Sequence, residues 1–324
     1  MTERRALVHL LFLFLLPVIV AWFGWSVPAA IAAVLLMLVW RWLITLSTWV
    51  APEKVPAILL ETISASHFVE KVRWNMDVAG LDYTEKPAAG TLGASFLGRT
   101  VPRLKIRTGA VRSQISNSPD ILRYLWGAYR ATHGDNIKHL EPTRERIDLE
   151  KRLDRCGTSL QVWAYHHLLE DRELALHVWG ANAPTVPIWQ RAAIRLLFPL
   201  QALLIRKSFR ITPERYKKAC QQIEELLGDI DTSLADGRVS ILGDDEPNYT
   251  DYAFAAMMGL WLQPAGYGGG AAEHVRIERS RATSPMRADI ERWVEDYPRA
   301  VDWVQQLYAE RRQEVSPKPA TADA

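Results

Sequence analysis

The hydrophobic pattern of the chain changes character near residue 52. Before that point, two apolar runs, residues 6–25 and 29–40, are separated by a short break. The first run has the ~20 residues that an α-helix needs to cross a hydrocarbon layer ~30 Å thick, so it predicts one membrane span. The second run continues past Arg41. We expect the pair to form a membrane-embedded or transmembrane helical hairpin within residues 1–52.

The charges beside these runs predict a topology. Arg4 and Arg5 precede the first run, and Arg41 and Lys54 follow the second. The positive-inside rule then places both ends of the hairpin on the cytoplasmic side. We therefore expect the large remainder of the chain to face the cytoplasm from an inner or plasma membrane. A cleaved secretory signal, with residues 27–30 as its small-residue site, is the alternative to the hairpin.

After residue 56, the spacing of apolar residues changes from that of a strand to that of a helix. A short apolar run, residues 58–60, ends in a small polar cluster, and Val72 and Met76 then follow at helical spacing. This pattern predicts a buried strand that passes into an amphipathic helix ending near Gly80. Ser66 lies at the junction. It suits a helix N-cap there, and the free N–H groups of the helix would stabilise an anion.

Three further elements complete a β-α-β order followed by a hairpin and a helix. Residues 81–86 predict a second strand, parallel to the first because a helix returns the chain. Residues 100–106 and 110–112 predict the two strands of a tight hairpin, and Pro102 stands early in the first of them. Ser118 predicts the cap of the next helix, since Pro and Asp occupy the following two positions.

The rest of the chain is predicted to be helical. Amphipathic or capped segments predict helices over residues 143–170, 184–210, 212–227, 248–262 and 285–312. A flexible Gly-rich loop is expected before the last helix, and a disordered tail over residues 313–324. The apolar stretch 192–205 suits either the core or a membrane-facing surface.

Composition excludes several classes of function. The 324 residues are 48% hydrophobic and carry a net charge of +2, without the dense Lys/Arg block typical of nucleic-acid binding. We therefore expect no nucleic-acid partner. The two cysteines, Cys156 and Cys220, do not have the spacing of a zinc site, so we expect reduced, packed thiols and no metal.

The order and spacing of these motifs resemble the glutathione S-transferase family. Residues 66–73, SHFVEKVR, look like the Ser-Pro-Phe-x-x-Arg/Lys-Val segment in which the family carries its catalytic Ser or Cys. Val101-Pro102 matches the position of the family's cis-proline. Asn117-Ser118 falls where the family has an acid or Gln followed by Ser, and residues 243–253 look like its capping-box segment.

The resemblance covers about residues 56–311 and implies a fold. That fold is an α/β thioredoxin-like domain over residues 56–130, followed by an all-α helical domain over residues 141–312. The membrane hairpin would precede both. Two residues depart from the family pattern: His67 stands where Pro is usual, and Asn117 replaces the acid or Gln.

The resemblance also implies a site. The catalytic residue would be Ser66, whose hydroxyl would stabilise the thiolate of glutathione acting as co-substrate. Glutathione itself would contact Phe68, Val101, Pro102, Asn117 and Ser118. Ser in place of Cys favours conjugation over disulfide exchange, because a hydroxyl cannot take part in thiol exchange. The implied partners are glutathione, a small apolar electrophile and membrane lipid, and the resemblance allows a homodimer.

Three functions are compatible with these residues. The first is a membrane-anchored glutathione transferase. The second is a non-catalytic scaffold that binds glutathione or only keeps the fold. The third is a membrane-interaction protein with a vestigial cleft. A plain N-cap role for Ser66 would suit the second and third.

Overall fold

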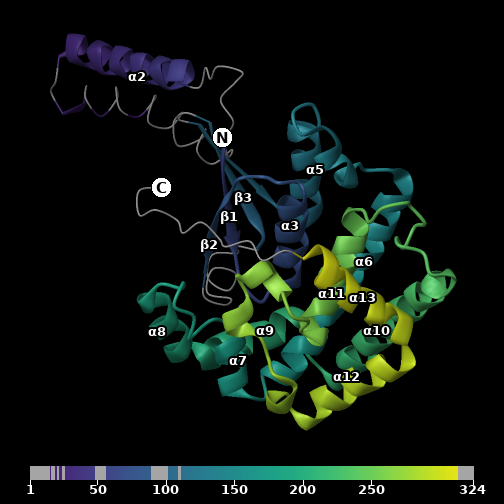
Figure 1. The fold of residues 1–324 in the computed structure, drawn as a ribbon. Coiled ribbons are helices and arrows are strands. Elements are labelled where there is room, and N and C mark those ends of the chain that lie inside the picture. Colours follow the sequence, from purple (N-terminus) through teal and green to yellow (C-terminus); the bar gives the residue numbers. More distant parts are fainter. Residues whose placement is uncertain are drawn as a thin grey trace. The chain divides into compact units, whose positions relative to one another are not determined.

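The fold combines one four-stranded sheet with a larger set of helices (Figure 1). The computed structural model describes residues 15, 19, 22–23, 26–47, 56–88, 101–108 and 111–312. Internal contacts divide the chain into two compact units: residues 1–59 with 105–114, and residues 60–104 with 115–324. The predicted loop over residues 90–99 and the predicted tail over residues 313–324 lie outside the described residues.

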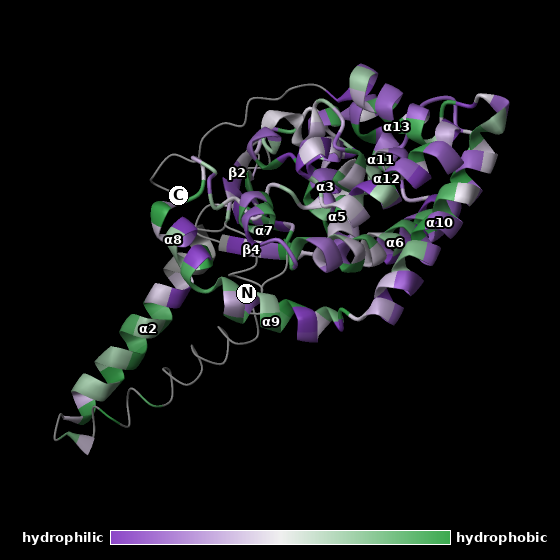
Figure 2. Ribbon diagram, turned by 90° about the horizontal axis from the view of Figure 1, so that it is seen from below, coloured by the Kyte–Doolittle hydropathy of each residue, from purple (hydrophilic) through white to green (hydrophobic). Residues whose placement is uncertain are grey.

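The described part of the N-terminal segment includes the apolar helix α2 (Val27–Ser47), which runs through Arg41 without a break. Most of its large apolar side chains up to Trp42 are exposed, with Leu36 at 70%, and Figure 2 colours most of the helix as hydrophobic. No single helix among the described residues is both long and apolar enough to cross a membrane. The run over residues 6–25 falls largely outside the described residues, so the hairpin stays a prediction.

The sheet has the strand order β2-β1-β3-β4. The strands are β1 (Ala57–Thr62), β2 (Thr84–Pro87), β3 (Arg103–Thr108) and β4 (Val111–Ser116). The N–H of Ala88, just past β2, donates to the carbonyl of Thr62 at the end of β1 over 2.9 Å, so these two strands run parallel as predicted. An ion pair joins Arg103 to Glu61, so β3 begins beside the end of β1 and runs antiparallel to it.

Helix α3 (His67–Val78) follows β1 as the apolar spacing predicts, with Ser66 as its N-cap. Val72 and Met76 are fully buried, and Gly80, at φ +66°, ends the helix in the left-handed conformation that glycine adopts readily. Several boundaries differ from the prediction, including those of the two hairpin strands, which cover residues 103–108 and 111–116 rather than 100–106 and 110–112. The second strand begins at Thr84 rather than residue 81, and Ser118 is the first residue of its helix rather than the cap.

The remaining helices lie C-terminal to the sheet, as predicted. They are α5 (Ser118–Tyr129), η1 (Gly134–Leu140), α6 (Arg144–Leu168), α7 (Arg172–Val178), α8 (Ile188–Leu196), α9 (Phe198–Phe209), α10 (Pro213–Ser233), η2 (Leu234–Asp236), α11 (Tyr249–Leu262), η3 (Tyr267–Gly270), η4 (Glu273–Val275), η5 (Arg279–Arg281), α12 (Ser284–Asp296) and α13 (Pro298–Arg311). The mixed sheet followed by helices fits the thioredoxin-like and helical architecture that the resemblance implies.

Prolines break two helices that were predicted as continuous. The segment 184–210 bends by 72° between α8 and α9, with Pro199 in the first turn of α9. The last helix breaks at Tyr297, because Pro298 lacks the N–H that would continue the hydrogen-bond ladder. The loop predicted as flexible before that helix instead forms the three short turns η3, η4 and η5, in which Tyr267 and Val275 are buried.

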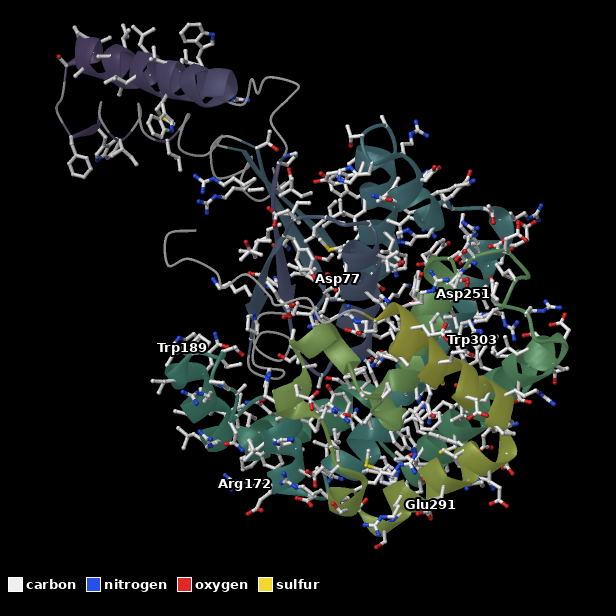
Figure 3. The ribbon with its side chains drawn as sticks, viewed as in Figure 1. Asp77, Arg172, Trp189, Asp251, Glu291 and Trp303 are labelled. Atoms are coloured by element: carbon white, nitrogen blue, oxygen red, sulfur yellow. The ribbon has the colours of Figure 1, made fainter. Side chains whose placement is uncertain are left out.

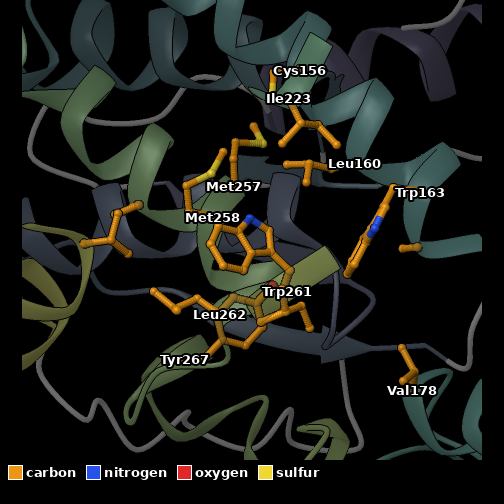
Figure 4. Close-up of a cluster of buried hydrophobic side chains, with 14 of the residues drawn as sticks. Cys156, Leu160, Trp163, Val178, Ile223, Met257, Met258, Trp261, Leu262 and Tyr267 are labelled. Carbon is orange, nitrogen blue, oxygen red and sulfur yellow. The ribbon is translucent and has the colours of Figure 1, made fainter. Parts of the chain in front are cut away.

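Helix α11 lies at the centre of the core of the second unit. All but one of its residues are buried, and it packs against both α3 and α6. Figure 4 shows Met257, Met258 and Trp261 of this helix among side chains from α6, α7 and α10. This packing holds α3, and therefore the residue at its N-terminus, against the helical part of the chain.

Candidate functional site

Three chain positions meet at one end of the sheet, which we call the site edge. It is the end at which β1 finishes and β3 begins, as the ion pair between Glu61 and Arg103 shows. β4 is the neighbour of β3 and follows it after two residues, so β4 also finishes at this end. Ser66, Pro102 and Ser118 each stand next to one of these strand ends. The structure thus brings together the predicted site residues from three separate segments.

Ser66 caps α3. Its Oγ accepts a hydrogen bond from the N–H of Val69 over 3.4 Å, and its backbone is extended, with φ −75° and ψ 121°. The side chain is partly exposed. Capping uses a lone pair of the hydroxyl and leaves its proton available, because a serine hydroxyl is one donor and a double acceptor. The N-cap role and donation to a bound anion are therefore compatible.

His67, in the first turn of α3, is a packing residue. Its ring is 3% exposed, and Nε2 lies 3.0 Å from the carbonyl oxygen of Gly157 in α6, to which it donates when that nitrogen carries the proton. Burial lowers the pKa of His67 to about 4, although the bond to Gly157 opposes this shift. The imidazole is therefore neutral at pH 7 and places no positive charge beside Ser66.

Acidification from pH 7 to pH 5 should lower the free energy of unfolding by about 2 kcal/mol through His67 alone. In this window the unfolded imidazole, with its ordinary pKa of 6.5, binds a proton that the folded one, with a pKa of about 4, does not bind. Stability therefore rises with pH here. Urea unfolding at both pH values measures the effect, and His67→Gln should lose less stability than the wild type by that amount. Parallel pH profiles would contradict this assignment.

The ring of Phe68 lies against Gly157 of α6. A Cβ built on Gly157 of α6 would lie only 2.7 Å from Cζ of Phe68 and 2.8 Å from Sδ of Met257. Gly157 thus lets α3 and α6 approach closely, and the ring of Phe68 fills the contact between them. Glutathione binding by Phe68 stays a prediction.

Val101 and Pro102 precede β3, and the peptide bond between them is cis. Pro102 is buried, whereas Val101 is partly exposed. Because Pro102 has no N–H, it cannot donate to a neighbouring strand at this point. The main chain of Val101 lies at the site edge because it precedes the start of β3. An extended ligand could pair with it there.

Asn117 and Ser118 follow β4. Asn117 is exposed and has φ +79° and ψ 125°, a conformation that costs a non-glycine residue roughly 1–3 kcal/mol. Strain of this kind persists where the surrounding structure enforces it, often at a ligand site. Ser118 is buried at the first position of α5, so the unpaired N–H groups of that helix face the same edge.

A buried ionic network lies beneath this edge. Arg73 pairs with Glu70 over 2.8 Å and with Glu85 of β2 over 2.7 Å. Arg312, which follows α13, pairs with Glu70 over 2.8 Å and with Asp77 over 2.7 Å. Burial alone would raise the pKa of Glu70, but the two guanidinium groups hold it below its ordinary value. The network therefore fastens α3 to both β2 and the end of the helical region.

The sequence pattern did not single out this network. Helical periodicity assigns charged positions of α3 to solvent, yet Glu70, Lys71 and Arg73 are all buried. Lys71 pairs with Glu150 and Asp154 of α6, each over 2.8 Å. One feature of the sequence did indicate such a network. Three charged residues occur within four positions of a helix that is expected to pack on a sheet, so some of them must be buried and need oppositely charged partners.

Tyr267 also contacts the site, and the sequence did not indicate this contact. It is 1% exposed, and its hydroxyl donates to the carbonyl of Ala65, next to Ser66, over 3.1 Å. Beside Ala65 lies a cavity of about 20 Å³. Its lining is largely apolar and comprises Ala65, Trp163, Ala164, Leu168, Val178, Leu260, Gln263, Tyr267, Val275, Ile277 and Met286. This space holds one or two water molecules at most.

The described residues contain no group of three or more His, Cys, Asp or Glu side chains placed to hold a metal ion. Cys156 and Cys220 are both buried, free thiols. Burial raises the pKa of Cys156 to about 12, so it is not a reactive thiolate at neutral pH. Among the described residues, the candidate chemistry therefore rests on hydroxyl and backbone groups.

No family model and no curated protein match the chain. Among solved structures, it is similar to a glutathione S-transferase from Methylobacterium radiotolerans in complex with glutathione sulfonate, at 14% identity and TM-score 0.47, covering 83% of this chain and 98% of that one. A glutathione S-transferase from Ceriporiopsis subvermispora in complex with glutathione is 18% identical, with TM-score 0.47 and coverage of 81% and 99%. FzlA from C. crescentus is 14% identical, with TM-score 0.42 and coverage of 82% and 96%. Similarities this low assign no activity, ligand or partner to this chain.

Proposed function

We propose that the chain is a membrane-anchored, glutathione transferase-like protein that activates the glutathione thiolate for attack on an apolar electrophile. The observation that carries the proposal is the convergence of Ser66, Val101 and Ser118 at the site edge. Ser66 and Ser118 stand at the N-termini of helices, and Val101 precedes a proline, with its main chain at the site edge. A tripeptide with one thiol and two carboxylates is the class of ligand that such an edge recognises.

Thiolate activation follows from the groups around Ser66. A free thiol has a pKa near 8.5, and a helix N-terminus with a hydroxyl donor lowers it towards neutrality. The Oγ of Ser66 already accepts from Val69, so its proton is free to hydrogen-bond the sulfur. The thiol proton would leave to solvent. The thiolate would then form a carbon–sulfur bond with the electrophile, and a leaving group, where present, would depart with its electron pair.

The other two positions would hold the peptide. The extended backbone of glutathione would pair with the main chain of Val101, as a strand adds to an open edge. Ser118 and the N–H groups of α5 would bind the γ-glutamyl carboxylate, since a helix N-terminus favours an anion. Asn117 would orient the same end of the ligand, which gives its strained backbone a function.

The anchor would be the N-terminal apolar region. The exposed side chains of α2, such as Leu36 and Trp40, suit lipid rather than water as their surroundings. The positive-inside rule would place the catalytic part in the cytoplasm. An apolar electrophile that partitions into the bilayer would then be concentrated near the protein.

Ser66→Ala is expected to raise the pKa of bound glutathione by roughly one to two units, because the lost hydrogen bond to a charged group is worth about 1.5–3 kcal/mol. Turnover at neutral pH should fall about ten-fold or more and partly recover at higher pH. Ultraviolet thiolate absorbance of bound glutathione against pH measures the shift directly.

Ser66→Thr is the matched control, because threonine keeps both the hydroxyl and the N-cap. It should titrate close to the wild type. Identical titrations of wild type and Ser66→Ala, or no binding of glutathione at all, would refute the catalytic role and leave Ser66 as a cap.

The capping bond of Ser66 favours a second candidate, a non-catalytic scaffold that binds glutathione without turnover, because capping alone accounts for a serine at this position. Turnover of generic electrophiles discriminates the two candidates. A glutathione-dependent rise in Tm without turnover would favour the scaffold.

A further inference from the structure

Helices α8 and α9 form a bent pair, the α8–α9 elbow, with a row of large apolar side chains on its outside. On α8, Ile188, Trp189 and Leu196 are 75%, 68% and 80% exposed. On α9, Leu200 and Leu203 are 42% and 50% exposed. Trp189 is labelled on α8 in Figure 3. Single exposed apolar residues are ordinary, but five on two consecutive short helices mark an interaction surface.

The opposite side of the elbow is buried in the second unit. Ile194, Phe198, Gln201 and Ile205 recur at helical spacing and are buried. The elbow is therefore apolar on two sides, with one stripe packed against the protein and the other uncovered. Its helices have 9 and 12 residues, about 14 and 18 Å of length, so neither crosses a ~30 Å hydrocarbon layer.

The charges of the elbow all have one sign. Residues 184–210 contain five basic residues, Arg191, Arg195, Arg206, Lys207 and Arg210, and no Asp or Glu. Arg206 pairs with Glu170, which follows α6, whereas Lys207 and Arg210 are exposed to solvent. Exposed apolar side chains beside exposed cations are the pattern of a surface that binds an anionic lipid interface.

We infer that the α8–α9 elbow docks on the face of a bilayer with anionic headgroups. Trp189 and the exposed leucines would enter the interface, while Lys207 and Arg210 contact lipid phosphates. This contact is separate from the predicted N-terminal anchor and does not depend on transferase activity. Like charges on two elbows repel each other, which disfavours a second copy of the chain as the occupant.

The test uses full-length protein with one exposed cysteine added for an environment-sensitive fluorophore. Leu196→Cys places the label on the elbow, and Gln305→Cys places it at an exposed position of α13, a helix that Figures 1 and 2 both show away from α8. The two native cysteines are buried and should not react. The protein is mixed with vesicles of phosphatidylcholine alone or with phosphatidylserine, each carrying nitroxide-labelled lipid as quencher.

Quenching at position 196 should be several-fold stronger in phosphatidylserine vesicles than in neutral ones, and position 305 should be quenched little in either. Lys207→Gln with Arg210→Gln should reduce the quenching at position 196 in anionic vesicles at least several-fold. Equal quenching at both positions, or none at either, would overturn the inference. The label at position 196 could also be shielded from solvent in the absence of lipid. If light scattering then shows that the protein is a dimer, the elbow binds a second copy of the chain and not a membrane.

Discussion

Replacing Arg312 with Ala is expected to lower the free energy of unfolding by about 3–5 kcal/mol, because the change strips the partner from buried charges. The side chain of Arg312 is fully buried and pairs with Glu70 and Asp77, and its guanidinium lies 5.5 Å from the ring of Trp74. Glu70 would still form its ion pair with Arg73, whereas Asp77 (labelled in Figure 3) would lose its ion pair with Arg312. Chemical unfolding followed by circular dichroism measures the loss.

The neighbouring residue supplies the control. Arg311 also pairs with a carboxylate, that of Glu246, but both side chains are largely exposed. Arg311→Ala should therefore change stability by less than about 0.5 kcal/mol. If the two variants proved equally stable, the buried network would not hold α3. Because Ser66 stands at the N-terminus of that helix, Arg312→Ala should also weaken glutathione binding if the proposed site is correct.

Asp251→Ala should have an effect of similar size, about 4 kcal/mol. The carboxylate of Asp251 is buried in the first turn of α11 and accepts hydrogen bonds from the N–H groups of Asn248 and Ile241, over 2.7 and 2.8 Å, and from the hydroxyl of Ser240 over 2.9 Å. Bonds to a charged group contribute about 1.5–3 kcal/mol each, and their loss leaves two buried N–H groups unpaired. Figure 3 labels Asp251 at this helix start.

Asp245→Ala is the comparison for that variant. Asp245 lies in the same segment but is exposed, so its removal should change the unfolding free energy by less than about 0.5 kcal/mol. Asp251→Asn should fall between the two, since an amide oxygen still accepts some of these bonds. A loss as small for Asp251→Ala as for Asp245→Ala would show that the start of α11 is held by packing alone.

Local signals in the sequence predicted much of this architecture. Asn248 caps the helix whose start its side chain indicated, because capping is a short-range hydrogen bond. The helices predicted to start at residues 143 and 212 begin one residue later, with those threonines as their caps. The apolar spacing through Val72 and Met76 also predicted the buried face of α3, because the helical repeat is set by neighbouring residues. The break at Pro298 was not predicted, because the prediction ran a single helix over residues 285–312.

The rest depends on residues that are distant in sequence. Arg312 and Glu70 are separated by 242 positions, and no periodicity links them. Tyr267 stands in a Gly-rich stretch that predicted a flexible loop, yet its hydroxyl reaches Ala65 across 202 positions. The closeness of Ser66, Pro102 and Ser118 depends on strand order, which only the resemblance suggested. Sequence spacing alone could not place the three together.

The position of Arg312 also has a consequence for how the protein is made. The carboxylates of Glu70 and Asp77 lie near the start of the second unit, whereas their shared cation is added only after every later helix has been synthesised. Before residue 312 is synthesised, the nascent chain lacks this cation. It must then either bury the two carboxylates without their full complement of positive charge or leave α3 exposed to water. We therefore expect ribosome-bound fragments ending before residue 312 to keep α3 accessible to protease, with resistance appearing once Arg312 has left the ribosome.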